Sequence, residues 1–113
     1  MNAIEFVKKF GVEESAKIAN ESVEFGKNVF YDLSDELYYG SDFGGRICVN
    51  DLKQIVDAFE LVETSLPELK QAMFSDSKDL DYVKNWVLTV SEKLLTEKGI
   101  KLKQAINLVE QCS

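Results

Sequence analysis

The chain has 113 residues, 45% of them hydrophobic and 29% charged, a composition typical of one folded domain rather than a disordered segment. Twenty Asp and Glu residues against thirteen Lys and Arg give a net charge of −7, which opposes binding to nucleic acid phosphates. No apolar run could span a membrane, and the opening MNAIEFVKKF contains Glu5 and no apolar signal core, so we expect a cytoplasmic protein.

The N-terminal part predicts two helices that meet at a glycine. Apolar residues recur at helical spacing in NAIEFVKKFG, with Asn2 placed as an N-cap and Gly11 as a stop. A second helix is expected from Glu13 to about Phe25, where Gly26 interrupts the pattern. The position of Gly11 between the two runs predicts a tight helix–helix corner.

The next segment, YDLSDELYYGSDFGG, is the most unusual in the chain because it is rich in aromatic, acidic and glycine residues and has no basic residue. In one interpretation, Phe30, Leu33 and Leu37 extend an apolar stripe in a short helix, followed by a flexible connection. The alternative is a minor two-stranded hairpin near residues 28–49, formed by Asn28 to Tyr31 and Arg46 to Val49.

The remaining sequence predicts further amphipathic helices. One runs from an Asn50 cap to Glu63, and a shorter one from Pro67 to about Phe74 is capped by Ser65. A long stripe then extends from Leu80 to Leu95 and ends at Gly99, and the last helix covers LKQAINLVEQC. The predicted fold is therefore all-α: a single domain, residues 1–113, built as a bundle of five to six helices.

The sequence contains no recognisable catalytic or metal-binding pattern. The chain has no histidine, which removes the commonest general base and zinc ligand, and no phosphate-binding glycine motif occurs. The EF-hand calcium pattern fails in both possible registers, since Leu37 stands where glycine is needed when the pattern starts at Asp32 and where a ligand is needed when it starts at Asp35. Asp32 and Glu36, one helical turn apart, could form an acid–base pair. Like charges at this spacing repel each other mildly, however, so we expect both side chains to lie on a face exposed to solvent. Cys48 and Cys112 are expected to be reduced thiols. We expect no catalytic residue, no metal and no cofactor.

The middle segment also has a functional interpretation. Tyrosine gives a large contact area with a polar tip and is enriched at binding hot spots, and acidic neighbours steer a surface toward a basic partner. The candidate partner-binding residues are Tyr38 and Tyr39, with Asp35, Glu36 and Asp42 around them.

Three segments carry a resemblance: NAIEFVKKFG at the start, DLKQIVDAFELVE in the middle and LKQAINLVEQC at the end. Together they resemble small uncharacterised accessory or early-region proteins of tailed temperate, lambda-like phages of enteric bacteria. The similar segments cover about a third of the chain, and Phe59 stands where those proteins carry a histidine. The resemblance implies a phage-derived protein that acts in the bacterial cytoplasm, and it implies no catalytic residue.

We therefore expect a non-enzymatic protein that binds a host or phage protein, with inhibition of a host or defence factor as one outcome. DNA mimicry by the acidic surface is a variant of this hypothesis. Two alternatives stay open. The first is a DNA- or RNA-binding regulator, because residues 82–113 carry five lysines and only three acids. The second is a self-associating structural protein, in which an exposed stripe that includes Trp86 and Leu94 pairs between chains.

Overall fold

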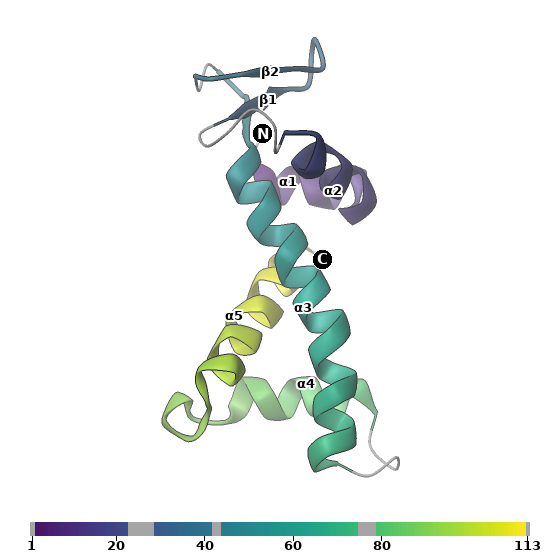
Figure 1. Ribbon diagram of the computed structural model, residues 1–113, viewed down its shortest axis with the longest axis vertical. Helices are drawn as coiled ribbons and strands as arrows, with labels where there is room; N and C mark the ends of the chain where they lie inside the picture. Colours follow the sequence, from purple (N-terminus) through teal and green to yellow (C-terminus); the bar gives the residue numbers. More distant parts are fainter. Residues whose placement is uncertain (1, 23–28, 42–43, 75–78, 113) are drawn as a thin grey trace. The chain divides into compact units, whose positions relative to one another are not determined.

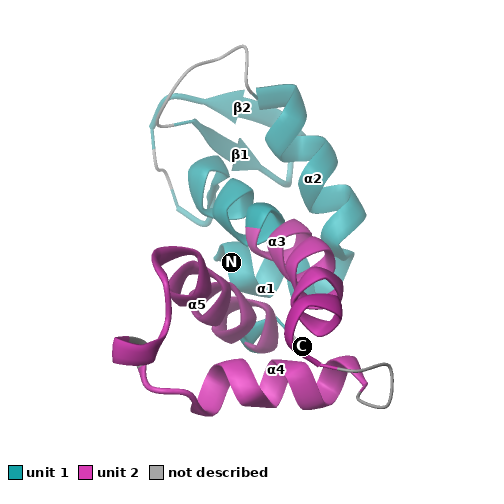
Figure 2. Ribbon diagram, turned by 60° about the horizontal axis from the view of Figure 1, so that its bottom comes forward, with its two compact units in different colours: residues 1–57, 111–113 teal, residues 58–110 magenta. Residues whose placement is uncertain are grey.

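A computed structural model describes residues 2–22, 29–41, 44–74 and 79–112, and in these ranges the chain forms five α-helices and a small antiparallel sheet (Figure 1). The predicted predominantly helical fold is confirmed. The chain divides into two compact units, residues 1–57 with 111–113 and residues 58–110 (Figure 2). Each unit is described by itself, and one folding domain over residues 1–113 stays a prediction. No helix of the described residues is long and apolar enough to cross a membrane.

The first unit begins with the predicted helix pair. Helix α1 (Ala3–Phe10) starts at Asn2, whose side chain accepts the Glu5 N–H at 2.8 Å. It ends at Gly11, which donates its N–H to the Val7 carbonyl at 2.9 Å. The φ angle of 89° at Gly11 lies in a region that favours glycine, and α2 (Val12–Glu21) begins directly afterwards. The predicted cap, stop and corner are confirmed, whereas the stop at Gly26 lies outside the described residues.

The segment after α2 forms a three-stranded sheet instead of a helix. The strands are β1 (Phe30–Asp32), β2 (Leu37–Tyr39) and β3 (Ile47–Cys48), in the order β2-β1-β3 with both pairs antiparallel. The predicted pairing of the two segments is confirmed by β1 and β3, but they do not form a two-stranded hairpin, because the unpredicted strand β2 lies between them in the sequence and pairs with the other edge of β1. The helical interpretation is wrong: Leu33 and Leu37 do not share a buried stripe but are 38% and 56% exposed.

The strand alternation explains which side chain of β1 enters the core. Tyr31 is buried, and the Phe6 ring of α1 meets it edge-on at 6.3 Å between centroids. Ile47, which pairs with Tyr31 across the sheet, is fully buried, as is Leu52 at the start of the following helix. Aromatic residues on a pleated, half-buried surface favour this arrangement over a helix.

Helix α3 (Val49–Met73) is continuous, although the sequence predicts two helices separated near Ser65. Ser65 is buried and Pro67 lies inside the helix, so the predicted cap at Ser65 is wrong. The apolar stripe continues through the proline, because Leu66 is 5% exposed and belongs to the core of the second unit. Burial of that stripe outweighs the helix-breaking tendency of the proline.

The second unit also divides the predicted long helix from Leu80 to Leu95. Helix α4 (Leu80–Thr89) ends at Val90, which has an extended backbone, and a 3₁₀ turn, η2 (Glu92–Leu94), follows. Helix α5 (Glu97–Gln111) contains Gly99 in its first turn, so Gly99 is not the predicted stop. The Lys103 ammonium donates to the Val90 carbonyl at 3.2 Å and thereby satisfies one carbonyl at the end of α4.

The core of the second unit is formed by apolar side chains of α3, α4 and α5. Helix α4 lies beside the C-terminal part of α3 and the helix α5 (Figures 1 and 2). The buried side chains of this cluster are Leu66, Val83, Val87, Leu102 and Ile106.

Candidate functional site

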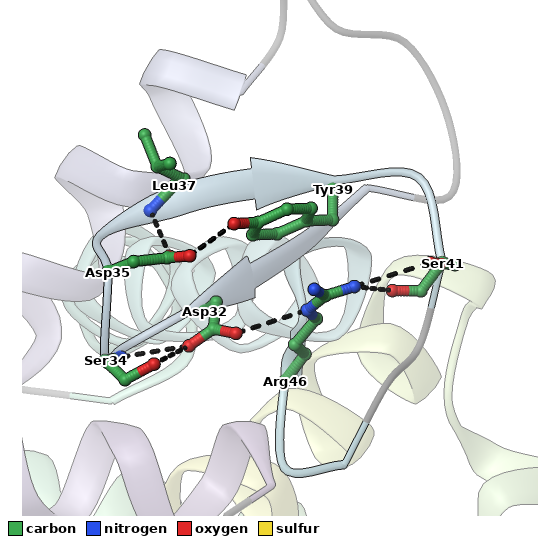
Figure 3. A network of polar contacts seen from close by, with 7 residues as sticks. All are labelled: Asp32, Ser34, Asp35, Leu37, Tyr39, Ser41 and Arg46. Atoms are coloured by element: carbon green, nitrogen blue, oxygen red, sulfur yellow. Dashed lines mark hydrogen bonds and ion pairs between the residues drawn. The ribbon is translucent and has the colours of Figure 1, made fainter.

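The turn between β1 and β2 is held by side chains of its own sequence (Figure 3). The Asp32 carboxylate accepts the Ser34 N–H at 3.0 Å and the Ser34 hydroxyl at 2.6 Å, and the Asp35 carboxylate accepts the Leu37 N–H at 3.0 Å. The Glu36 N–H donates to the Asp32 carbonyl at 2.8 Å, and Glu36 has a φ of 58°. Side chains of Asp that bond the backbone two residues on favour turns over helices. We call residues Leu33–Leu37 the hairpin tip.

Arg46, which directly precedes β3, links the end of β1 next to the hairpin tip with the segment that follows β2. Its Nε lies 3.3 Å from the Asp32 carboxylate, and another of its nitrogens donates to the Ser41 carbonyl at 2.9 Å. The guanidinium also stacks on the Tyr39 ring at 3.6 Å from the centroid. The Tyr39 hydroxyl donates to the Asp35 carboxylate, which joins this network to the turn (Figure 3). The hydrogen bonds from Ser34, followed by the hydrogen bond and the charge of Arg46, lower the pKa of Asp32.

Tyr38 connects the hairpin to α2. Its ring packs against Tyr31 with 5.3 Å between centroids, and the one hydrogen of its hydroxyl is shared between two acceptors, the Ile18 carbonyl at 3.3 Å and the Glu21 carboxylate at 3.2 Å. Partial burial, followed by the charge of Glu21, raises the pKa of Tyr38 from 10.0 to about 12. The neutral hydroxyl is therefore the form that the folded protein favours.

The five predicted partner-binding residues occupy different environments. Asp35 and Glu36 are exposed at the hairpin tip, whereas Tyr38 and Tyr39 are half-buried with their hydroxyls bonded within the chain. Asp42 lies outside the described residues. The prediction that they bind a partner stays a prediction, but the tyrosines are placed to support the hairpin.

The sequence interpretation missed three residues that contribute to the candidate site. Leu33 and Leu37 are the large apolar side chains that the hairpin tip exposes, and Arg46 is the cation that fastens it. The spacing of Asp32, Ser34 and Asp35 is the signal that could have identified the turn, because short polar side chains favour such Asx turns.

The lysines of residues 82–113 bear on the nucleic-acid alternative. Four of the five have acceptors: Lys84 with Glu110 at 3.2 Å, Lys98 with Glu68 at 3.7 Å, Lys101 with Glu97 at 3.8 Å and Lys103 with the Val90 carbonyl. Charges paired in this way contribute little to a phosphate-binding surface. The geometry therefore gives a nucleic-acid-binding regulator no support.

The polar side chains of this region form hydrogen bonds that stabilise the turn. Among the described residues, no group of three or more Cys, Asp and Glu side chains is placed to hold a metal ion. Both Asp32 and Asp35 accept backbone N–H groups of the turn. Cys48 and Cys112 are free thiols, and burial raises the pKa of Cys112. Comparisons with protein-family models, curated proteins and solved structures give no match for this chain.

Proposed function

We propose that this chain is a non-enzymatic accessory protein that binds another protein through its hairpin tip. The observation that carries the proposal is a contrast between the backbone and the side chains of residues 32–37. The backbone of the tip is fastened by Asp32 and Asp35, while Leu33 and Leu37 expose 38% and 56% of their surface. A rigid turn that holds apolar side chains in water lowers the entropy cost of binding through them.

The partner that fits the hairpin tip has an apolar pocket with a basic rim. Leu33 and Leu37 supply the apolar anchors, and the exposed carboxylate of Glu36 lies between them in the sequence. The overall charge of −7 would steer the protein toward a basic surface and speed association. In this proposal Tyr38 and Tyr39 act as supports of the tip. Phage origin and a bacterial host or phage partner belong to the same proposal and rest on the sequence resemblance alone.

Site-specific photo-crosslinking tests this proposal while the identity of the partner is still open. A benzophenone amino acid replaces Leu37 in one variant and Leu80 in the control variant, and both are expressed in a bacterial host cell. Leu80 is a suitable control because it is an exposed leucine too, at 43%, and lies on α4 in the other unit.

We expect one protein other than the chain itself to be crosslinked from position 37 and not from position 80. When the crosslinking is repeated in lysate of the same cells, its yield should fall as salt is raised, since the steering is electrostatic. Equal crosslinking from both positions, or none from position 37, would contradict the proposal.

A further inference from the structure

The second unit carries an apolar hollow of about 450 Å³, a feature separate from the hairpin tip. The C-terminal part of α3, the helix α4, and the segment from η2 into α5 provide its walls. Most of its lining is apolar, and the side chains that the argument uses are Leu69, Met73, Trp86, Leu94 and Leu102.

Two of the lining side chains project into solvent. Leu94 is 80% exposed and Met73 is 58% exposed, the two highest values among the exposed large hydrophobic side chains of the described residues. Leu94 does not lie on a loose loop, since its N–H donates to the Ser91 carbonyl at 2.9 Å. The same face thus presents an apolar hollow and apolar side chains that could fill such a hollow.

The charges at the hollow are balanced. Glu68 and Lys98 both line it, lie 3.7 Å apart and expose about 70% of their side chains, 69% and 73% respectively. This pair adds no net charge to the rim, although the chain as a whole carries a net charge of −7, which on average makes two copies repel each other. A rim with one charge of each sign can instead face its own copy, because each Glu68 meets a Lys98 of the other molecule.

We propose that this face is a homodimer interface with two-fold symmetry. In a two-fold interface the same patch occurs on both sides, so a surface must be complementary to itself. Here Leu94 of each copy enters the hollow of the other, and the Glu68 and Lys98 rims pair across the interface. The inference is independent of the hairpin proposal, since it uses no residue of the first unit.

Sedimentation equilibrium of the purified full chain, from about 5 to about 200 µM, tests the inference. We expect the wild type to convert from monomer to dimer within this range. Leu94→Glu should raise the dimer dissociation constant about a hundredfold, because two buried leucines are lost and each contributes more than tenfold. Leu80→Glu makes the same change at an exposed leucine of α4 that does not line the hollow, and it should leave the constant within about twofold.

Charge exchange gives a second, finer measurement. Glu68→Lys and Lys98→Glu alone should each weaken the dimer by about threefold to tenfold, as expected for exposed ion pairs, and the double exchange should restore it. All four substituted positions are exposed, so circular dichroism should remain that of the wild type.

Three outcomes would overturn the inference. The first is a wild type that remains a monomer at every concentration. If this monomer also binds a small apolar dye, and Leu94→Glu abolishes that binding, the hollow is a site for a small ligand. The second is a dimer that Leu94→Glu leaves intact. The third is a double exchange that weakens the dimer more than either single change.

Discussion

Removal of the Tyr38 hydroxyl should destabilise the first unit by an amount that depends on pH. In Tyr38→Phe the ring keeps its packing on Tyr31 but loses a hydroxyl whose one hydrogen is shared between two acceptors at 3.2–3.3 Å, both longer than a usual O–H···O bond. The Ile18 carbonyl retains the Ser22 N–H as a partner, and Glu21 is exposed to water. No buried acceptor is left unpaired, so we expect a loss of about 1 kcal/mol at neutral pH.

The pH dependence has a definite sign. The folded-state pKa of Tyr38 is about 12 against an ordinary value of 10.0, so the folded protein prefers the protonated hydroxyl. The stability contributed by this hydroxyl is therefore complete below pH 10 and is lost as the pH rises through about 12. The shift corresponds to at most about 3 kcal/mol, and solvent screening of the half-buried group reduces the expected loss to about 1 kcal/mol.

The assay is urea unfolding of the wild type and Tyr38→Phe, followed by far-UV circular dichroism at several pH values from about 8 to about 12. The difference between the two proteins isolates Tyr38 from the other tyrosines and the lysines that also titrate. We expect the advantage of the wild type to be about 1 kcal/mol at the lower limit and close to zero at the upper limit. An advantage that is constant, or that grows with pH, would refute the proposed tie between β2 and α2.

Two further changes test the contacts inside each unit. Arg46→Ala should lower the free energy of unfolding by about 2 kcal/mol, because the ion pair with Asp32 and the stacking on Tyr39 are both lost. Arg46→Lys should recover less than half of this, since an ammonium cannot stack or bond as the planar guanidinium does; full recovery in urea unfolding would show that charge alone matters. Pro67→Ala should stabilise the second unit by about 2 kcal/mol, because alanine restores a backbone donor to the Glu63 carbonyl inside α3. Trp86 fluorescence during unfolding measures this, and a destabilised variant would contradict the account of α3.

The sequence predicted the first and the last helix well, whereas Asn50 and Ser65, predicted as caps beside apolar stripes, both lie inside α3. Asn2 and Gly11 bound α1 as expected, and the last helix buries Leu102, Ala105 and Ile106 as the spacing predicts. The prediction from sequence failed where a preference for helix and a preference for a turn compete in the same segment. The spacing of Leu33 and Leu37 suits a helix, but the Asp32 and Asp35 side chains bond the backbone of a turn instead.

The other failures have a tertiary origin. Pro67 is a helix-start signal when read locally, and only burial of its neighbour Leu66 shows why α3 continues through it. Similarly, the stripe from Leu80 to Leu95 gave no indication of the break at Val90, whose carbonyl is bonded by Lys103 from the next helix. Contacts between residues distant in the sequence determine these helix boundaries, and the spacing of apolar residues does not reveal such contacts.

For the candidate site, the sequence identified the segment but not the placement of its side chains. An acidic, aromatic segment without basic residues drew attention to Tyr38 and Tyr39. Their half-buried positions follow from pairing with β1, which brings Tyr38 opposite Tyr31 and Tyr39 opposite Phe30. Because side chains alternate across a strand, an unpredicted strand β2 left their exposure undetermined.

The most direct test of the central claim is the dissociation constant of the complex with the protein crosslinked from position 37, measured with purified components. The double variant Leu33→Ser/Leu37→Ser removes the exposed anchors of the hairpin tip, and Leu80→Ser is the matched control. We predict about tenfold or greater weakening for the double variant and less than about twofold for the control. A double variant that binds as tightly as the wild type, with circular dichroism unchanged, would contradict recognition through the hairpin tip.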